Sequence, residues 1–160
     1  METLNVEERV ARAVGYFKEG YNCAQSVVAA YADLYGFTLE QSLRMSASFG
    51  GGIGRMRETC GAACGMFLIA GLETGTVDPK DREGKGTNYK VVQDLAAEFI
   101  KRNGALKCGT LLGLDSNTPV STIPQERNKS YFEKRPCVKM VEQGARIIGE
   151  YLLIRLKLNA

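Results

Sequence analysis

Histidine and tryptophan are both absent from this chain of 160 residues. Without histidine, the chain has no Cys–His nucleophile pair, no His-ligated haem and no Cys-x-x-Cys-His haem attachment site. No pair of carboxylates stands out as a general acid and base, so we expect no hydrolytic mechanism. Long apolar runs are missing too, because the longest, Met66 to Leu72, is far shorter than the ~20 residues that cross a bilayer. We therefore expect no membrane span.

The composition is that of an ordinary soluble domain, with 44% apolar residues, 24% charged residues and a formal net charge of +3. No stripe of Lys and Arg alternates with aromatic residues, so we expect no nucleic-acid partner. The first residues, Met1 to Arg9, lack the basic and apolar segments of a signal peptide, which predicts a cytoplasmic protein. In a reducing cytosol, cysteine clusters more often bind metals or perform redox chemistry than form structural disulfides.

Apolar residues recur with helical spacing along most of the chain, and no stretch alternates as a strand does. We therefore predict a single all-α domain over residues 1–160, a helical bundle of about five to six helices with a long loop before the last helix. The predicted helices occupy residues 5–20, 22–36, 38–50, 60–72, 89–102 and from 137 onwards, with a short helix at 108–112.

Two boundaries are less clear in the sequence. Asp78-Pro79 is a typical helix cap and first turn, but Gly84 and Gly86 weaken the helix that follows, so its start is placed at Tyr89. Residues 114–135 show no clear periodicity and are predicted to form the long loop. A loop of this length in a compact domain usually binds or covers something.

Four of the five cysteines stand where a helix is predicted to begin, namely Cys23, Cys60, Cys108 and Cys137. The start of a helix presents free backbone N–H groups and the positive end of the dipole, which favours thiolate over thiol. Four such starts aimed at one point would form an anion pocket. We therefore predict that these sulfur atoms converge on one site, the alternative being structural cysteines scattered through the core.

A glycine-rich stretch, residues 50–54, leads to the motif Cys60-Gly61-Ala62-Ala63-Cys64-Gly65. Small residues beside a cysteine let the backbone approach a large ligand closely. The predicted cofactor contacts are Gly52, Gly54, Gly61 and Ala62. The alternative for the glycines at 61 and 65, four residues apart, is tight packing against another helix. Nucleotide binding is disfavoured, because the stretch follows a helix and lacks the Gly-Lys-Ser/Thr ending.

At these residues the chain resembles the C_GCAxxG_C_C family of redox-active proteins. That family is recognised by a lone upstream cysteine, a Cys-Gly-Ala-x-x-Gly motif after a glycine-rich stretch, and two further single cysteines. Cys23, residues 60–65, Cys108 and Cys137 match these elements in order, and the likeness extends over residues 11–153. The resemblance implies a small helical protein with a redox role, in which the cysteines of some relatives are thought to hold a metal or iron–sulfur centre. It implies no substrate.

Four thiolates are the ligand set of a [2Fe–2S] cluster, whose negative charge gains from helix starts. The four cysteines are 37, 48 and 29 residues apart, unlike the Cys-x-x-Cys knuckles of structural zinc sites or the compact runs of ferredoxins. Such spacing favours a cofactor assembled by a finished fold. We therefore predict that Cys23, Cys60, Cys108 and Cys137 bind a metal centre, foremost [2Fe–2S], for electron transfer or redox sensing, with zinc as the alternative.

Two other functions stay open. Without a metal, the same four cysteines and Cys64 could cycle between dithiol and disulfide, which would make the protein an oxidoreductase. The absence of a Cys-x-x-Cys pair counts against a thioredoxin-like enzyme. The chain could also be an interaction module without chemistry, in which the helix at 64–72 simply packs.

Several residues near the motif have two interpretations. Cys64 lies one helical turn after Cys60, either as a fifth sulfur near the site or as a small buried residue. Arg55, Arg57 and Glu58 could balance the charge of a cluster or dock an unknown redox partner, although solvated loop charges are more common. The apolar stripe of the last helix could pair two chains as a homodimer.

Overall fold

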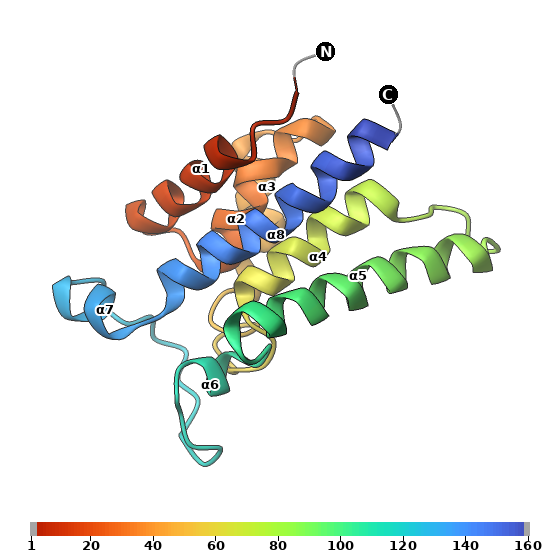
Figure 1. Cartoon of the computed structure of the whole chain (residues 1–160). Helices are drawn as coiled ribbons and strands as arrows, with labels where there is room; N and C mark the ends of the chain where they lie inside the picture. Colours follow the sequence, from red (N-terminus) through yellow and green to blue (C-terminus); the bar gives the residue numbers. More distant parts are fainter. Residues whose placement is uncertain (1–2, 159–160) are drawn as a thin grey trace.

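The computed structural model describes residues 3–158, which form a bundle of α-helices (Figure 1). The α-helices are α1 (Val6–Glu19), α2 (Cys23–Tyr31), α3 (Leu39–Ser46), α4 (Gly61–Thr74), α5 (Arg82–Asn103), α6 (Cys108–Leu111), α7 (Lys129–Lys134) and α8 (Cys137–Leu158), and the 3-10 helices are η1 (Ala32–Tyr35) and η2 (Ala47–Phe49). The all-α single-domain prediction is confirmed. The helix count is higher than predicted, with eight α-helices among the described residues.

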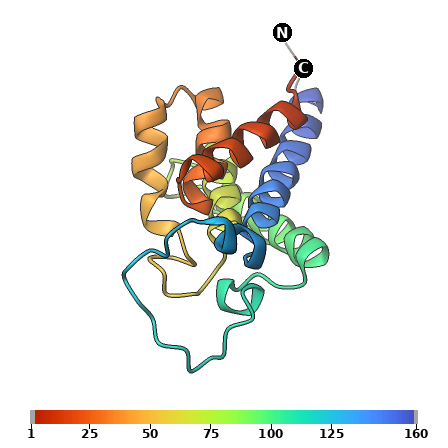
Figure 2. The same ribbon diagram turned by 90° about the vertical axis from the view of Figure 1, so that its left-hand side faces the viewer.

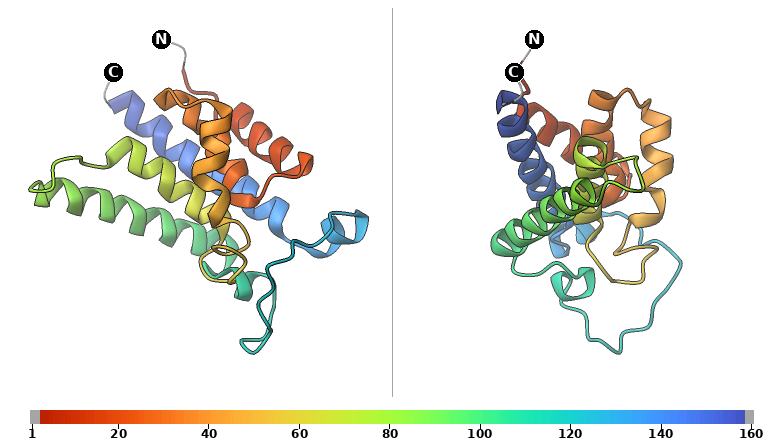
Figure 3. Two further views of the ribbon diagram at one scale, coloured as in Figure 1. Left: turned by 180° about the vertical axis from the view of Figure 1, so that it is seen from behind. Right: turned by 90° about the vertical axis from the view of Figure 1, so that its right-hand side faces the viewer.

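Helices α1, α8, α4 and α5 lie side by side, and α2 and α3 pack behind them (Figures 1 and 3). Helix α4 contacts α2, α5 and α8, which makes it the centre of the bundle. Helices α6 and α7 and the long loop between them gather at one end of the bundle, and the two termini leave from the other end (Figure 2). None of the helices within residues 3–158 combines the length and the apolar character that crossing a membrane would require.

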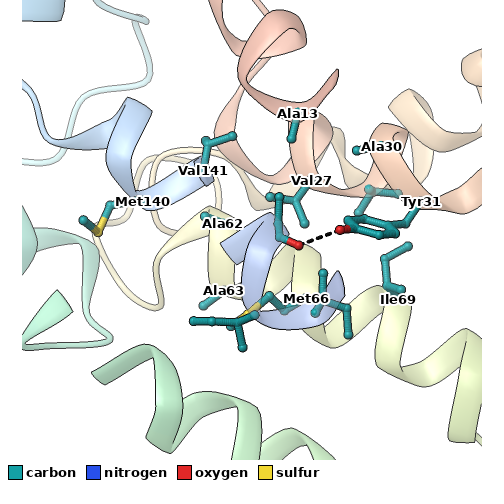
Figure 4. Packing of buried hydrophobic residues seen from close by; sticks show 14 of the residues in the cluster. Ala13, Val27, Ala30, Tyr31, Ala62, Ala63, Met66, Ile69, Met140 and Val141 are labelled. Atoms are coloured by element: carbon teal, nitrogen blue, oxygen red, sulfur yellow. Dashed lines mark hydrogen bonds between the residues drawn. The ribbon is translucent and has the colours of Figure 1, made fainter. Parts of the chain in front are cut away.

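Helix α4 occupies the centre because its residues are small or apolar on every side. Ala62, Met66 and Ile69 are fully buried and pack in one cluster with residues of α2 and α8 (Figure 4). A Cβ added at Gly65 would lie 2.8 Å from Val27 Cβ, so glycine is what lets α4 approach α2 this closely. For Gly65 the structure therefore favours helix packing over a ligand contact.

Polar side chains define most helix starts as the sequence predicts. The side chains of Asn5, Asn22 and Thr38 each accept a hydrogen bond from the first turn of α1, α2 and α3, respectively. Asn22 and Thr38 form complete capping boxes with glutamines three residues later. The second predicted helix is divided into α2 and η1, and it ends at Gly36 as expected.

Two predicted boundaries are wrong. Helix α5 begins at Arg82 instead of Tyr89, because Asp81 and not Asp78 is the cap, and its carboxylate accepts from the Gly84 N–H at 2.8 Å. A glycine in the first turn therefore does not prevent this helix. The end of helix α4, expected at Gly71 or Gly75, lies at Thr74 with Gly75 as the C-cap, so this boundary is confirmed. Residues 114–135 are not all loop, since Asn128 caps the short helix α7.

A buried hydroxyl links α2 to α8. Tyr31 is fully buried, and its hydroxyl donates to the Ala145 carbonyl at 2.6 Å (Figure 4). The hydroxyl fits because α8 carries Gly149 beside it. A Cβ at that position would overlap Tyr31 Oη and would lie 2.8 Å from Val6 Cγ1. The contact between α1, α2 and α8 therefore depends on a glycine in the middle of α8.

This contact predicts opposite effects for two helical Gly→Ala substitutions. Gly149→Ala should lower the free energy of unfolding by about 1–3 kcal/mol, because the methyl group has no space. Gly15→Ala in α1, where a Cβ meets nothing within 4 Å, should raise it by about 0.5–1 kcal/mol. Urea denaturation of the two variants measures both values, and changes of the same sign would contradict this account.

Candidate functional site

Four widely separated cysteines share one cavity at the end of the bundle that carries α6 and α7. The cavity has a volume of about 320 Å³, and its walls include Cys23, Cys60, Cys108 and Cys137. Cys60 and Cys108 are buried, whereas Cys23 and Cys137 are half-buried. Four segments that are distant along the chain therefore bring their sulfur atoms to one place.

Each of these cysteines stands at the start of a helix. Cys23, Cys108 and Cys137 are the first residues of α2, α6 and α8, and Cys60 is the N-cap of α4. Backbone N–H groups therefore point at the sulfurs. The N–H groups of Gly51 and Ala24 interact with the Cys23 sulfur, and those of the second and third residues of α4 interact with the Cys60 sulfur.

Close backbone approach at the start of α4 holds Cys23 in the cavity wall. A Cβ added at Gly61 would overlap Cys23 Sγ and would lie 2.8 Å from the Phe49 carbonyl oxygen. Any larger residue there must displace the sulfur or the backbone. Gly61 also lines the cavity itself.

Two short backbone segments fix the positions of Cys60 and Cys108 relative to each other. The Cys60 N–H donates to the Leu106 carbonyl at 2.8 Å, and the Cys108 N–H donates to the Glu58 carbonyl at 2.6 Å. A single β-bridge joins Thr59 to the residue before Cys108. The two cysteines are therefore held by the main chain as well as by packing.

The glycine-rich stretch forms an unusual loop beside these segments. Residues 51–55 all have positive φ, between 58° and 74°, and Arg57 also has a positive φ of 62°. For Ile53, Arg55 and Arg57 this left-handed conformation costs ~1–2 kcal/mol each. Main-chain hydrogen bonds support the loop, including Glu58 N–H to Gly52 O at 2.9 Å. The loop directs both arginines to the cavity wall.

The predicted cofactor contacts separate into two pairs. Gly54 and Gly61 line the cavity, whereas Gly52 and Ala62 are not part of its wall. A Cβ added at Gly52 would lie 2.5 Å from Cys108 Cβ, so this glycine serves close packing of the loop on α6. Ala62 is fully buried in the core.

Positive charge surrounds the cysteines. The cavity wall contains Arg55, Arg57, Arg127 and Arg135 and no carboxylate. Arg57 Nη1 lies 3.8 Å from Cys108 Sγ. Glu58, which was expected to act together with Arg55 and Arg57, is exposed and is not part of the cavity wall.

Sequence reasoning did not single out Arg127 and Arg135. The Arg127 guanidinium lies 4.1 Å from the centre of the Phe17 ring and donates to the Tyr21 carbonyl at 2.8 Å. The Arg135 guanidinium lies 5.4 Å from the centre of the Tyr131 ring and donates to Gln125. No local motif marks these arginines. The one sequence feature that pointed to them was their position in the second half of residues 114–135, the segment predicted to bind or cover a ligand.

The segment between α6 and α7 contributes to the wall as a cover. Thr122, Pro124 and Gln125 line the cavity. Arg55 Nη1 donates to the Ser121 carbonyl at 2.8 Å and to the Ile123 carbonyl at 2.5 Å. One cavity arginine therefore holds the cover in place.

Burial of the sulfur atoms opposes the formation of thiolates. Burial raises the pKa of Cys23, Cys60 and Cys137, and nearby cysteines raise it further, although backbone N–H groups lower the first two and the Tyr131 hydroxyl lowers the third. The N–H groups at the helix starts do favour thiolate at Cys23 and Cys60, but burial has the larger effect. Without a cation, these thiols stay neutral at pH 7.

Cys64 does not reach the cavity. Its sulfur lies 3.7 Å from the Thr59 carbonyl, the side chain is buried, and burial raises its pKa to about 11. This environment is typical of a small apolar core residue. Among the five cysteines, Cys64 is the one that is not part of the cavity wall, although Cys23 and Cys108 lie near enough to raise its pKa further.

The four thiols line one cavity but do not form the tight tetrahedron that holds a single metal ion. Within residues 3–158, no three His, Cys, Asp or Glu side chains surround one point closely enough to hold a single metal ion. A [2Fe–2S] cluster places two thiolates on each of two irons, so its ligands surround a larger volume than those of one zinc ion.

The comparisons with known proteins agree with the motif. A family model described as "Putative redox-active protein (C_GCAxxG_C_C)" matches residues 21–151, which include all five cysteines. A protein of Archaeoglobus fulgidus, described as "Uncharacterized protein", is 26% identical over 148 residues, which cover 88% of this chain and 91% of the relative. No solved structure shows a significant match.

The start of α4 predicts a site-specific effect of a small substitution. Gly61→Ala should push the Cys23 sulfur from its position, lower the free energy of unfolding by about 1–3 kcal/mol and speed alkylation of Cys23. A Cβ at Gly71 in the same helix would meet nothing within 4 Å. Gly71→Ala should therefore neither lower the free energy of unfolding nor speed alkylation of Cys23. Mass spectrometry after timed iodoacetamide treatment measures the first effect. Equal alkylation of Cys23 in both variants would contradict it.

The raised thiol pKa values predict how the stability of reduced, metal-free protein depends on pH. Above about pH 8.5 the unfolded chain loses thiol protons that the folded chain keeps, so stability should fall as pH rises from about 8.5 to 10. Each such thiol contributes a slope of up to about 1.4 kcal/mol per pH unit. Urea unfolding at several pH values measures the slope, and Cys60→Ala should flatten it. Stability that rises over this interval would refute the assignment.

Proposed function

The chain belongs to the C_GCAxxG_C_C family of redox-active proteins, and we propose that Cys23, Cys60, Cys108 and Cys137 hold a [2Fe–2S] cluster for electron transfer or redox sensing. The observation that carries the proposal is one cavity whose wall combines these four thiols with four arginines and no carboxylate. Neutral structural cysteines would have no need of such surroundings.

The charges of the wall support an anionic metal–thiolate group. A cluster bound by four thiolates is negatively charged. Arg57 stands at 3.8 Å from the Cys108 sulfur, and the backbone N–H groups at the starts of α2 and α4 point at two other sulfurs. These groups would stabilise thiolate charge in a partly buried site.

The raised pKa values count against a free reactive thiol, whereas a bound metal ion can still displace the proton. A buried thiol gives up its proton when a metal ion takes the place of that proton, so metal binding is coupled to proton release. A thiol–disulfide enzyme, by contrast, requires a thiolate at neutral pH, and burial of Cys23, Cys60 and Cys137 works against it. The dithiol mechanism is therefore the weaker alternative.

When bound, a [2Fe–2S] cluster supplies a one-electron couple whose potential depends on nearby charge, hydrogen bonds and solvent exposure. This chain contributes to all three. The arginines supply charge, the helix starts supply N–H donors, and the segment between α6 and α7 covers the cavity through its bonds to Arg55. These features would protect the sulfur atoms from solvent.

Two cysteines on the same helix provide a matched test. Protein purified without oxygen should be brown and contain about two irons and two sulfides per chain. Cys60→Ser should remove most of the iron, whereas Cys64→Ser, one turn further along α4 and outside the cavity, should keep it. Iron and sulfide analysis with absorption spectra measures this. Colourless protein with one zinc, or a reversible disulfide between two cavity cysteines without iron, would refute the cluster.

A further inference from the structure

Ten of the eleven arginines of this chain fall into two groups, and Arg82, exposed at the start of α5, belongs to neither. Six arginines outside the cavity form ion pairs with carboxylates, namely Arg9, Arg12, Arg44, Arg102, Arg146 and Arg155. Among residues 3–158, none of the four cavity arginines has a carboxylate within ion-pair distance. Among residues 3–158, the four arginines beside the cysteines therefore lack a carboxylate partner, as exposed Arg82 also does, and they are the ones that line a cavity.

Three of these four arginines, Arg55, Arg57 and Arg135, donate through a single guanidinium nitrogen and keep unused hydrogen-bond donors. A guanidinium has five N–H donors. Arg55 binds the covering segment through Nη1 alone, and Arg135 donates to Gln125 through Nη2 alone. In the part of the chain that the structure describes, their remaining N–H groups have no acceptor. Arg57 and Arg127 are placed differently, the first beside Cys108 and the second on the Phe17 ring.

The charge balance leaves a surplus on the cavity wall whether or not a cluster is bound. Four guanidinium groups and no carboxylate line the cavity. With a four-thiolate [2Fe–2S] cluster, on the order of two negative charges oppose the four positive ones. An additional anion would reduce the repulsion among the arginines in both states. The cavity of about 320 Å³ has space for one, since a water molecule takes about 30 Å³ of liquid volume.

We propose that the arginine side of this cavity binds a small oxyanion, with Arg55 and Arg135 as its principal donors and Gln125 and Thr122 of the cover beside it. The anion carries at least two acceptor oxygens, because a guanidinium binds such groups through two parallel hydrogen bonds. An inorganic oxyanion or a short carboxylate satisfies this description. The binding depends on the arginines alone. That the anion is the substrate of the redox centre rests on the proposed function.

The test compares oxyanions with chloride. Sulfate, phosphate and formate should each bind more tightly than chloride at equal ionic strength, measured by calorimetry and by the shift in Tm. Arg55→Gln should weaken this binding at least tenfold. Arg135→Lys, which keeps the charge but loses the planar fork, should weaken it severalfold. Arg82→Gln removes one exposed positive charge of α5, far from the cavity, and should change binding less than twofold.

The oxyanion site and the iron–sulfur cluster can be tested independently of each other. Binding is measured on protein loaded without oxygen and on reduced metal-free protein, with circular dichroism as the check on folding. Oxyanion binding by protein that takes up no iron would support the arginine site and refute the cluster. Iron uptake without oxyanion binding would support the cluster and refute the arginine site. The oxyanion site is refuted if none of the three anions binds better than chloride. It is also refuted if Arg55→Gln and Arg135→Lys bind as Arg82→Gln does.

Discussion

The close approach of α4 to α2 is the constraint on which the rest of the cavity depends. Gly61 and Gly65 place the α4 backbone against Cys23 and Val27, at distances that no Cβ would permit. This approach brings the starts of two helices together, and the backbone pairing of residues 57–60 with 106–109 then adds the start of α6. The fourth start, that of α8, follows from the packing of α8 on α4. The four cysteines share a cavity because the glycines of α4 let this helix approach α2 so closely.

Two opposing electrostatic effects act on the sulfur atoms, and burial is the larger one. The N–H groups at a helix start stabilise a thiolate by ~0.3–1 kcal/mol each at the surface, up to ~2 kcal/mol when partly buried. Removal of an ion from water costs several kcal/mol. The balance leaves the thiols of Cys23, Cys60 and Cys137 protonated, with their pKa values raised. Helix starts therefore orient these groups, but only a cation or another strong positive charge can ionise them.

Much of this architecture could be predicted from local patterns. The caps at Asn5, Asn22 and Thr38 and the apolar periodicity predicted the helices, because each of these signals depends only on residues that are close together in the sequence. The family motif identified the four cysteines that share the cavity. Patterns of this range could not distinguish Asp81 from Asp78 as the cap of α5, since both precede a plausible first turn. They also could not place Arg127 and Arg135, whose partners Phe17 and Tyr131 meet them only through tertiary packing.

The position of Cys137 at the start of the last helix has a consequence for biosynthesis. During translation, Cys23, Cys60 and Cys108 leave the ribosome before the segment that carries the fourth sulfur. Helix α8, which packs on α1 and α4, must form before the wall is closed. Any group that needs all four sulfurs can therefore be held completely only after α8 has been synthesised and packed on the bundle.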